Sequence, residues 1–189
     1  MGTPKGERRR QALAAAAGEL LRSGGFEAVR HRAVAEKAGL PLASTTYYFA
    51  SLDDLVTAAV EVTSREELAE GHAQLAALGD GPADAGALVE LVLDQLLGPE
   101  SRSGGLDAVL LRYERLVGAG RRPYLAPLMR ELRVELDDLL AAILARSGRP
   151  PDRDDLRRLV SLVDGTVLSA LIEADPDPRA AAREVLRTS

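Results

Sequence analysis

Apolar residues recur at three- and four-residue steps along most of this chain, which is the spacing of one face of an α-helix. The first periodic segment covers residues 5–23, and its apolar positions are Ala12, Leu13, Ala16, Leu20 and Leu21. The sequence SGG at 23–25 is expected to end this helix, because glycine readily takes the left-handed conformation of a helix terminus. A shorter helix is predicted over about 30–38, ended by Gly39.

A third short helix is predicted to start at Leu40–Pro41, because proline suits the first helical turn and disfavours helix in the residue before it. Ser51 is then the expected N-cap of a long helix, with Asp53 and Asp54 in the first turn, where the helix dipole favours anions. The later periodic segments cover residues 52–78, 84–97, 103–119, 122–147, 153–174 and 177–187. Since no β-type alternation of useful length interrupts them, we predict an all-α fold of about nine helices.

The two short helices form a recognisable motif with the longer helix ahead of them. Two helices joined by a glycine-containing turn are the plan of a helix-turn-helix head. Within the second of them, five consecutive residues carry hydroxyl groups: Ser44, Thr45, Thr46, Tyr47 and Tyr48. Because hydroxyl groups make many of the contacts to DNA phosphates and need no net charge, this stretch favours a DNA-binding surface.

The distribution of charge supports the same interpretation, although the net charge of −5 alone argues against a nucleic-acid partner. Residues 1–50 carry eight basic and four acidic side chains, a net charge of +4. The remaining 16 basic and 25 acidic side chains give residues 51–189 a net charge of −9. A basic head on an acidic body suits a protein that presents one end to a polyanion. An unselected fluctuation of surface charge is the alternative.

Composition narrows the class of protein further. Apolar residues make up 46% of the 189-residue chain, enough for a folded core, and the absence of cysteine excludes disulfides and thiolate metal sites. With two histidines and no glycine loop of the phosphate-binding type, we expect no enzyme activity, no cofactor and no metal site. No segment reaches the ~20 apolar residues of a membrane span, so a soluble cytoplasmic protein without a membrane partner is expected.

The segment GFEAVRHRAVAEKAGLPLASTTYYFASLDDLV, residues 25–56, resembles the DNA-binding head of the TetR family of bacterial repressors. The shared features are a Gly-aromatic turn, VAEKAG at the second helix and its turn, and TYYFASLDDL from the third helix onward. The resemblance implies a helix-turn-helix DNA-binding domain over 5–51 and an effector-binding and dimerisation domain over 52–189. It also implies a transcriptional regulator, a repressor that a small-molecule effector releases from its operator.

Contacts to double-stranded DNA are implied for the residues at the family's contact positions: Arg30, His31, Leu42, Ala43, Ser44, Thr46, Tyr47 and Tyr48. On a helix that begins near Pro41, Leu42, Ala43 and Thr46 would face the base edges, and the flanking hydroxyl groups would meet phosphates. Thr45 and Phe49, four residues apart, are expected to face the core of the head. Tyr47 matches the tyrosine that usually contacts phosphate in the family.

This sequence departs from the family pattern at four places. Arg30 stands where a capping Thr is usual, and Thr46 where Tyr is common. Leu42 and Leu52 replace frequent lysines, which leaves open a helical protein-interaction module with a degenerate head that does not bind DNA. The basic residues at 8–10, 30 and 32 could compensate, and Leu42 could contact a thymine methyl group.

A homodimer is expected, since helix-turn-helix proteins usually bind pseudo-palindromic operators as dimers. The resemblance implies a four-helix bundle made by helices 153–174 and 177–187 of each subunit. The first of these helices is apolar on nearly two sides, one of which carries the small residues Gly165 and Ser169. Its predicted interface residues are Leu159, Leu162, Val163, Thr166, Val167 and Ala170, for which burial within one subunit is the alternative.

The family's effector pocket is expected within residues 84–147. The predicted lining residues are Gln95, Leu110, Tyr113, Tyr124 and Met129, each of which also suits an ordinary core position. Because only two aromatic residues occur beyond residue 50, an aliphatic or modestly polar effector is favoured. An activator or a ligand-independent regulator remains an alternative to the repressor.

Overall fold

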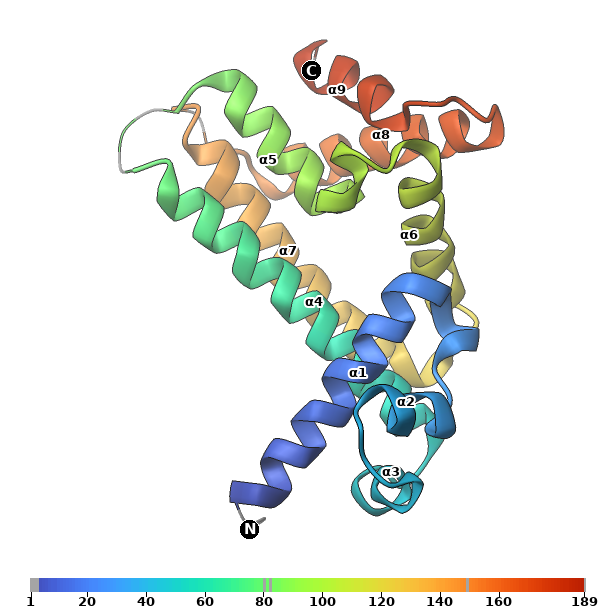
Figure 1. Ribbon diagram of the computed structural model, residues 1–189. Coiled ribbons are helices and arrows are strands. Elements are labelled where there is room, and N and C mark those ends of the chain that lie inside the picture. The colour runs from blue at the N-terminus through green and yellow to red at the C-terminus, as the bar shows by residue number, and fades with distance from the viewer. Residues whose placement is uncertain (1–3, 80, 82, 149, 189) are drawn as a thin grey trace. The chain divides into compact units, whose positions relative to one another are not determined.

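The computed structural model describes residues 4–79, 81, 83–148 and 150–188, and the described chain is all-α, as predicted (Figure 1). Its α-helices are α1 Pro4–Ala28, α2 His31–Lys37, α3 Leu42–Tyr48, α4 Leu52–Ala77, α5 Ala85–Leu97, α6 Gly105–Ala119, α7 Ala126–Ala145, α8 Arg153–Ile172 and α9 Pro178–Thr188. Nine α-helices and no strand lie in the described ranges, so the prediction of about nine helices is confirmed.

The helix boundaries differ from the predicted ones in two respects. Helix α1 does not end at SGG but kinks there, since Gly25 has φ 65° and ψ −166° and one further turn follows it. Two 3-10 helices, η1 (Pro99–Arg102) and η2 (Pro123–Leu125), occupy segments that the sequence indicated as a loop and as the start of α7. Each begins with proline, which suits the first turn of a helix, and both are too short for a periodic pattern.

The residues pack into two compact units. The first combines the chain up to Glu66 with Glu114–Arg130, and the second combines Glu67–Tyr113 with Glu131–Ser189. The predicted head, residues 5–51, therefore lies inside a larger packing unit, together with the first turns of α4 and the connection between α6 and α7. The functional boundary at residue 51 stays a prediction.

In the first unit, small side chains bring α1 close to α4. A Cβ added to the buried Gly18 would lie 2.8 Å from Cγ2 of Thr63, so only glycine fits without a shift of α4. The apolar core around this contact is sealed, with Leu13 and Leu55 fully buried and Phe49 only 3% exposed. The core thus joins α1 to α4 and holds the residue that follows α3.

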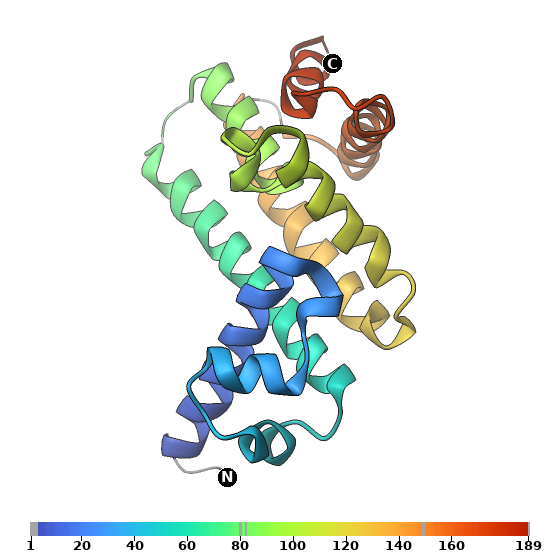
Figure 2. The same ribbon diagram turned by 45° about the vertical axis from the view of Figure 1, so that its right-hand side comes forward.

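In the second unit, α9 packs against α8 and α5 (Figure 2). Leu93 of α5, Leu139 and Ile143 of α7, and Val163 and Val167 of α8 have no exposed surface. None of the described helices is both long and apolar enough to cross a bilayer.

A buried ion network fastens α9 to α5 and η1. Arg179 is only 3% exposed, and its guanidinium donates to Glu90 Oε2 at 2.7 Å and to Ser101 Oγ at 2.6 Å. The same guanidinium lies 2.9 Å from Asp94 Oδ1. Both Asp94 oxygens also accept from Arg102, which makes Asp94 the acceptor of a bidentate pair. A buried charge is tolerated when partners surround it in this way.

Glu90 is the second acid of this network. Arg183 donates to its Oε1 at 2.5 Å. That hydrogen bond, opposed by burial and assisted by Arg179, lowers the pKa of Glu90 to about 2. The carboxylate is therefore ionised throughout the neutral range.

Candidate nucleic-acid interface

Helices α2 and α3 form a helix-turn-helix around a glycine turn. Gly39 has φ +63°, a conformation that side chains other than glycine rarely adopt. The turn is closed by hydrogen bonds from the backbone N–H of Gly39 to Glu36 O at 3.1 Å and from that of Leu40 to Ala35 O at 3.0 Å. Helix α3 then begins at Leu42 with Pro41 as its N-cap residue, close to the start predicted at Leu40–Pro41.

The outer surface of α3 is made by residues that the sequence assigned to DNA. Leu42 is 52% exposed and Tyr47 is 81% exposed, with Ala43 and Thr46 also exposed between them. On the opposite side, Thr45 is fully buried and donates its hydroxyl to Leu42 O at 2.7 Å. With Phe49 also buried, the prediction that Thr45 and Phe49 face the core is confirmed.

The remaining hydroxyl groups flank this surface. Ser44 and Tyr48 are half-buried, and the Tyr48 ring lies edge-on to Tyr47, with centroids 4.8 Å apart. Edge-to-face packing restrains two rings that would otherwise turn freely in solvent. Both tyrosines therefore belong to the surface of the head and not to its core.

At the start of α2, the two predicted contact residues differ in their exposure and in their hydrogen-bond partners. Arg30 is exposed but donates to Glu27, with its Nε 2.9 Å from the backbone oxygen and its Nη2 3.2 Å from Oε2. His31 is half-buried, and its Nδ1 is enclosed without a hydrogen-bond partner.

The recognition segment carries no charge of its own. Residues 38–52, from the turn through α3 to the start of α4, include no charged side chain. Leu42 and Leu52, which replace the lysines frequent in the family, are 52% and 41% exposed. Any electrostatic attraction of this head to a polyanion must therefore come from other elements.

A cavity of about 380 Å³ lies on the first unit, between the Gly-aromatic turn and the α6–α7 connection. Arg122 covers the Phe26 ring at 3.8 Å from its centroid and lies 3.6 Å from Glu27 Oε1. Tyr124 and Asp53 line the same cavity, and burial, followed by the Asp53 carboxylate, raises the pKa of Tyr124. These contacts attach the α6–α7 connection to the head within one unit.

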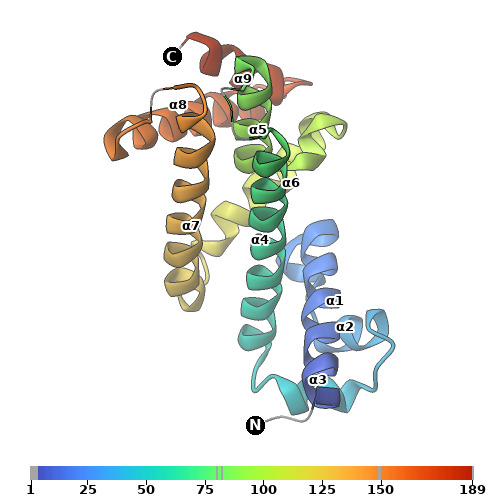
Figure 3. The same ribbon diagram turned by 90° about the vertical axis from the view of Figure 1, so that its left-hand side faces the viewer.

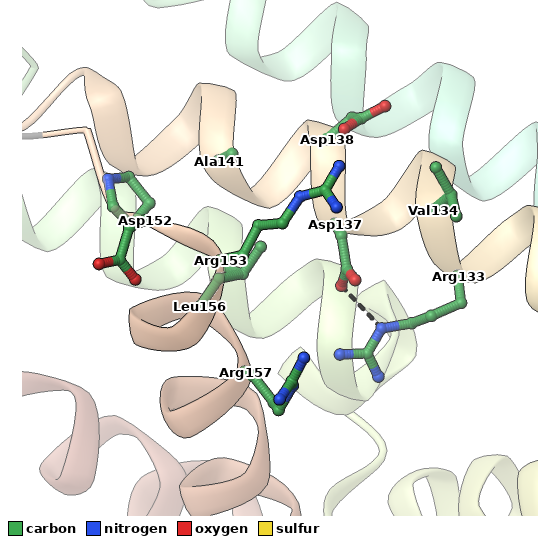
Figure 4. Close-up of a pocket in the computed structure, with 10 residues that line it drawn as sticks. Arg133, Val134, Asp137, Asp138, Ala141, Asp152, Arg153, Leu156 and Arg157 are labelled. Atoms are coloured by element: carbon green, nitrogen blue, oxygen red, sulfur yellow. Dashed lines mark hydrogen bonds and ion pairs between the residues drawn. The ribbon is translucent and has the colours of Figure 1, made fainter.

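A second cleft, of about 270 Å³, lies between α7 and the start of α8 in the second unit (Figure 4). Arg133 and Asp137 pair across one α7 turn at 2.7 Å, and Arg153 and Arg157 enter the cleft from α8 (Figure 4). Three arginines are matched by three aspartates in its lining, so the cleft has no net charge. It contains none of the predicted effector-binding residues.

The predicted effector residues are divided between the two units. Gln95 and Tyr113 lie in the second unit: Gln95 is 7% exposed and touches α4 at Gly71, while Tyr113 donates to Asp164 Oδ1 at 2.8 Å. Leu110, also in that unit, is 39% exposed, because Val109 takes the buried position of its turn. Tyr124 and Met129 lie half-buried in the first unit. A common pocket for the five stays a prediction, and Asp164 is a polar neighbour that the sequence did not single out.

The predicted dimer residues of α8 also fall into two groups. Val163, Val167 and Ala170 are buried within the subunit, which agrees with the alternative given for them, and their place in a dimer interface stays a prediction. Leu159 and Thr166 are half-buried, while Leu162 is 49% exposed. The exposed side continues through Gly165 and Ser169 to Ile172, which is 77% exposed and was missed from the sequence. Residues 162, 165, 169 and 172 share one helical face.

The helix-turn-helix with an exposed second helix, followed by a helical body, defines the class of DNA-binding transcriptional regulators. A family model described as Tetracyclin repressor-like, C-terminal domain, matches residues 83–189. The chain belongs to the TetR family of transcriptional regulators.

Solved structures agree with this assignment. The multidrug binding protein EbrR complexed with ethidium is 37% identical, with 95% of this chain and 97% of that chain covered and a TM-score of 0.68. EbrR complexed with imidazole is 36% identical, covering 95% and 93%, with a TM-score of 0.67. The TetR-family member SCO1917 from Streptomyces coelicolor A3 is 35% identical, covering 95% and 96%, with a TM-score of 0.63. No match is found among curated proteins.

Proposed function

We propose that the chain is a homodimeric repressor whose α3 enters the major groove of a pseudo-palindromic operator. The observation that carries this proposal is the exposed outer surface of α3, from which Leu42 and Tyr47 project into solvent. A seven-residue helix with such a surface fits a groove about 12 Å wide, whose floor presents thymine methyl groups to apolar side chains.

Each exposed residue then has a role that follows from its chemistry. Leu42, Ala43 and Thr46 face the base edges. Tyr47 and Tyr48 donate their hydroxyl groups to phosphates, as does Ser44. Arg30 and His31 meet the backbone from the start of α2, where the Glu27 pair is exposed on both sides and therefore inexpensive to break.

Replacing Tyr47 with phenylalanine is expected to weaken DNA binding by ~1 kcal/mol per half-site, because one hydrogen bond to phosphate is lost. The loss should be alike for all sequences, since a phosphate contact carries no base information. Fluorescence anisotropy with duplexes from upstream of the chain's own gene, and with point variants of them, measures both quantities. A loss confined to one base pair would reassign Tyr47 to base reading. A matched control is Tyr124→Phe, outside α3.

Release is proposed to follow effector binding in the body. Helix α4 begins four residues after α3 and continues without interruption to Ala77, so a tilt of α4 would change the orientation of the head. The effector must bind the DNA-incompetent state more tightly, and a few kcal/mol of preference shift the equilibrium usefully.

The body offers a carboxylate for a cationic effector. Asp164 is half-buried on α8, accepts the Tyr113 hydroxyl, and forms no ion pair with a described residue. Burial, followed by the Asp164 charge, raises the pKa of Tyr113, so this tyrosine remains a neutral donor. EbrR binds ethidium, proflavin and malachite green, which are cationic dyes. This similarity favours a cationic effector over the aliphatic or modestly polar one expected from the sequence.

Replacing Asp164 with asparagine is expected to weaken ethidium binding roughly tenfold, because a charge-assisted contact is replaced by a neutral one. Titration of ethidium fluorescence measures the affinity, and Asp138→Asn, which removes an exposed carboxylate of α7, is the matched control. Equal affinities for the native protein and Asp164→Asn would remove Asp164 from the effector site.

A further inference from the structure

The basic side chains in the first two turns of α1 form no ion pair with a carboxylate of the described residues. Three of the eight cations of the head are paired with carboxylates: Arg22 with Glu66, Arg30 with Glu27 and Lys37 with Glu19. No ion pair to a described residue is formed by the other five, which are Lys5, Arg8, Arg9, Arg10 and Arg32. Four of the five are thus concentrated in the first two turns of one helix, and all four are exposed.

This placement does not serve the stability of α1. Cations in the first turn oppose the helix dipole, and like charges four residues apart, such as Lys5 and Arg9, repel each other. The nearby acid, Glu7, accepts a hydrogen bond from Gln11 and not from an arginine. A solvated face therefore explains the charge poorly, whereas a polyanionic partner explains it directly.

A contact at the end of α3 fixes the position of these basic turns. The Arg10 guanidinium lies over the Phe49 ring, 5.4 Å from its centroid, within the range of a cation–π interaction. Phe49 is buried and immediately follows α3, where its backbone N–H donates to Thr45 O at 2.9 Å. Arg10 thus fixes the second turn of α1 beside the C-terminal end of α3. Figure 3 shows the N-terminal end of α1 and α3 at the same end of this unit.

We infer that the N-terminal turns of α1 are a second DNA-contacting element, with Lys5, Arg8 and Arg9 binding phosphates beside the half-site that α3 occupies. The inference rests on the proposed function and completes it. Residues 38–52 carry no charge, so α3 contributes shape and hydroxyl groups while α1 contributes the attraction to the backbone. Arg10 is the positioning residue, because it holds the basic turns against the end of α3.

The salt dependence of DNA binding tests this division of roles. Each phosphate contact changes the slope of log K against log salt concentration by about 0.9. In the double variant Arg8→Ala with Arg9→Ala, the slope should therefore be smaller in magnitude by about 2 for each bound head. Anisotropy with the upstream duplex at several salt concentrations measures the slope. Arg8→Lys with Arg9→Lys should retain the slope, since lysine also neutralises phosphate.

Arg157→Ala with Arg158→Ala is the matched control, because it removes the same charge from exposed positions of α8. Its slope should equal that of the native protein. Native protein on a duplex trimmed to the bare half-sites should reproduce the reduced slope of the Arg8 and Arg9 double variant.

An unchanged slope in a folded Arg8 and Arg9 variant that still binds would overturn the inference and leave the regulator proposal intact. An equal reduction in the Arg157 and Arg158 control would also overturn it, since net charge would then be the cause. Failure of the native protein to bind any duplex at low salt would instead contradict the proposed function itself. Thermal melting by circular dichroism verifies that each variant is folded.

Discussion

Replacing Arg179 with alanine is expected to lower the free energy of unfolding by about 3–5 kcal/mol, the typical cost of removing one partner from a buried ion pair. The guanidinium is the shared partner of Glu90, Asp94 and Ser101, and it is 3% exposed. Without it, the buried Asp94 carboxylate and the half-buried Glu90 carboxylate each lose a donor. Urea denaturation followed by circular dichroism measures the loss.

Arg183→Ala is the matched control for Arg179→Ala, since it lies one helical turn away and binds only the Glu90 carboxylate. Its side chain is 29% exposed, so water can replace it and the loss should be clearly smaller. Equal losses for the two variants would show that burial of Arg179 is not the source of its effect. Arg179→Met, which keeps the side-chain volume, should still destabilise because Asp94 and Glu90 each lose the Arg179 donor and keep only Arg102 and Arg183.

The same network predicts that the stability of the folded protein depends on pH. The pKa of Glu90 is lowered to about 2 in the folded protein from an ordinary value of 4.5. Because the pKa of Glu90 is lower in the folded protein than in the unfolded protein, its ionised carboxylate stabilises the folded state at pH values above about 4.5. This contribution is lost as the pH falls from about 4.5 toward 2. Denaturation curves of the native protein should show a lower free energy of unfolding as the pH falls through that window. The decrease should be smaller in Arg183→Ala, because Glu90 loses its strongest donor there.

Placing glutamates on the exposed face of α8 is expected to separate the proposed dimer and reduce operator affinity at least ~100-fold, or about 2.7 kcal/mol. The variant is Leu162→Glu with Ile172→Glu, at side chains that are 49% and 77% exposed in the single subunit. If this face meets its own copy about a two-fold axis, four carboxylates would meet in one interface. Each head would then bind its half-site alone.

Light scattering after size exclusion measures the oligomeric state, and anisotropy measures the affinity. Val134→Glu is the control for a single exposed apolar-to-acid change, because Val134 of α7 is 60% exposed. That variant should remain dimeric. A dimeric Leu162 and Ile172 double variant with native affinity would move the interface to another surface.

The sequence predicted local features of the fold well. Helix periodicity, the Ser51 cap and the burial of Thr45 and Phe49 depend on neighbours within one or two turns, and all are observed. The same local reasoning placed Leu42 and Thr46 outward, since a four-residue spacing defines a helical side directly, and both are exposed.

Features that depend on contacts distant in sequence were not predicted. Helix α8 is apolar on two sides, and its periodicity alone did not show that Val163, Val167 and Ala170 pack inside the subunit. The ion network of Arg179 joins residues about 89 positions apart, and charged residues ordinarily indicate surface. The stacking of Arg122 on Phe26 likewise had no local signal.

The packing of Glu114–Arg130 with the head bears on how this regulator can be re-engineered. Leu125 is fully buried in that unit, and Arg122 covers Phe26 there. A chimera that transplants only residues 5–51 onto a relative's body would leave these surfaces facing foreign side chains. To exchange operator specificity between relatives, two segments must therefore be transferred together: the N-terminal helices and the connection between α6 and α7.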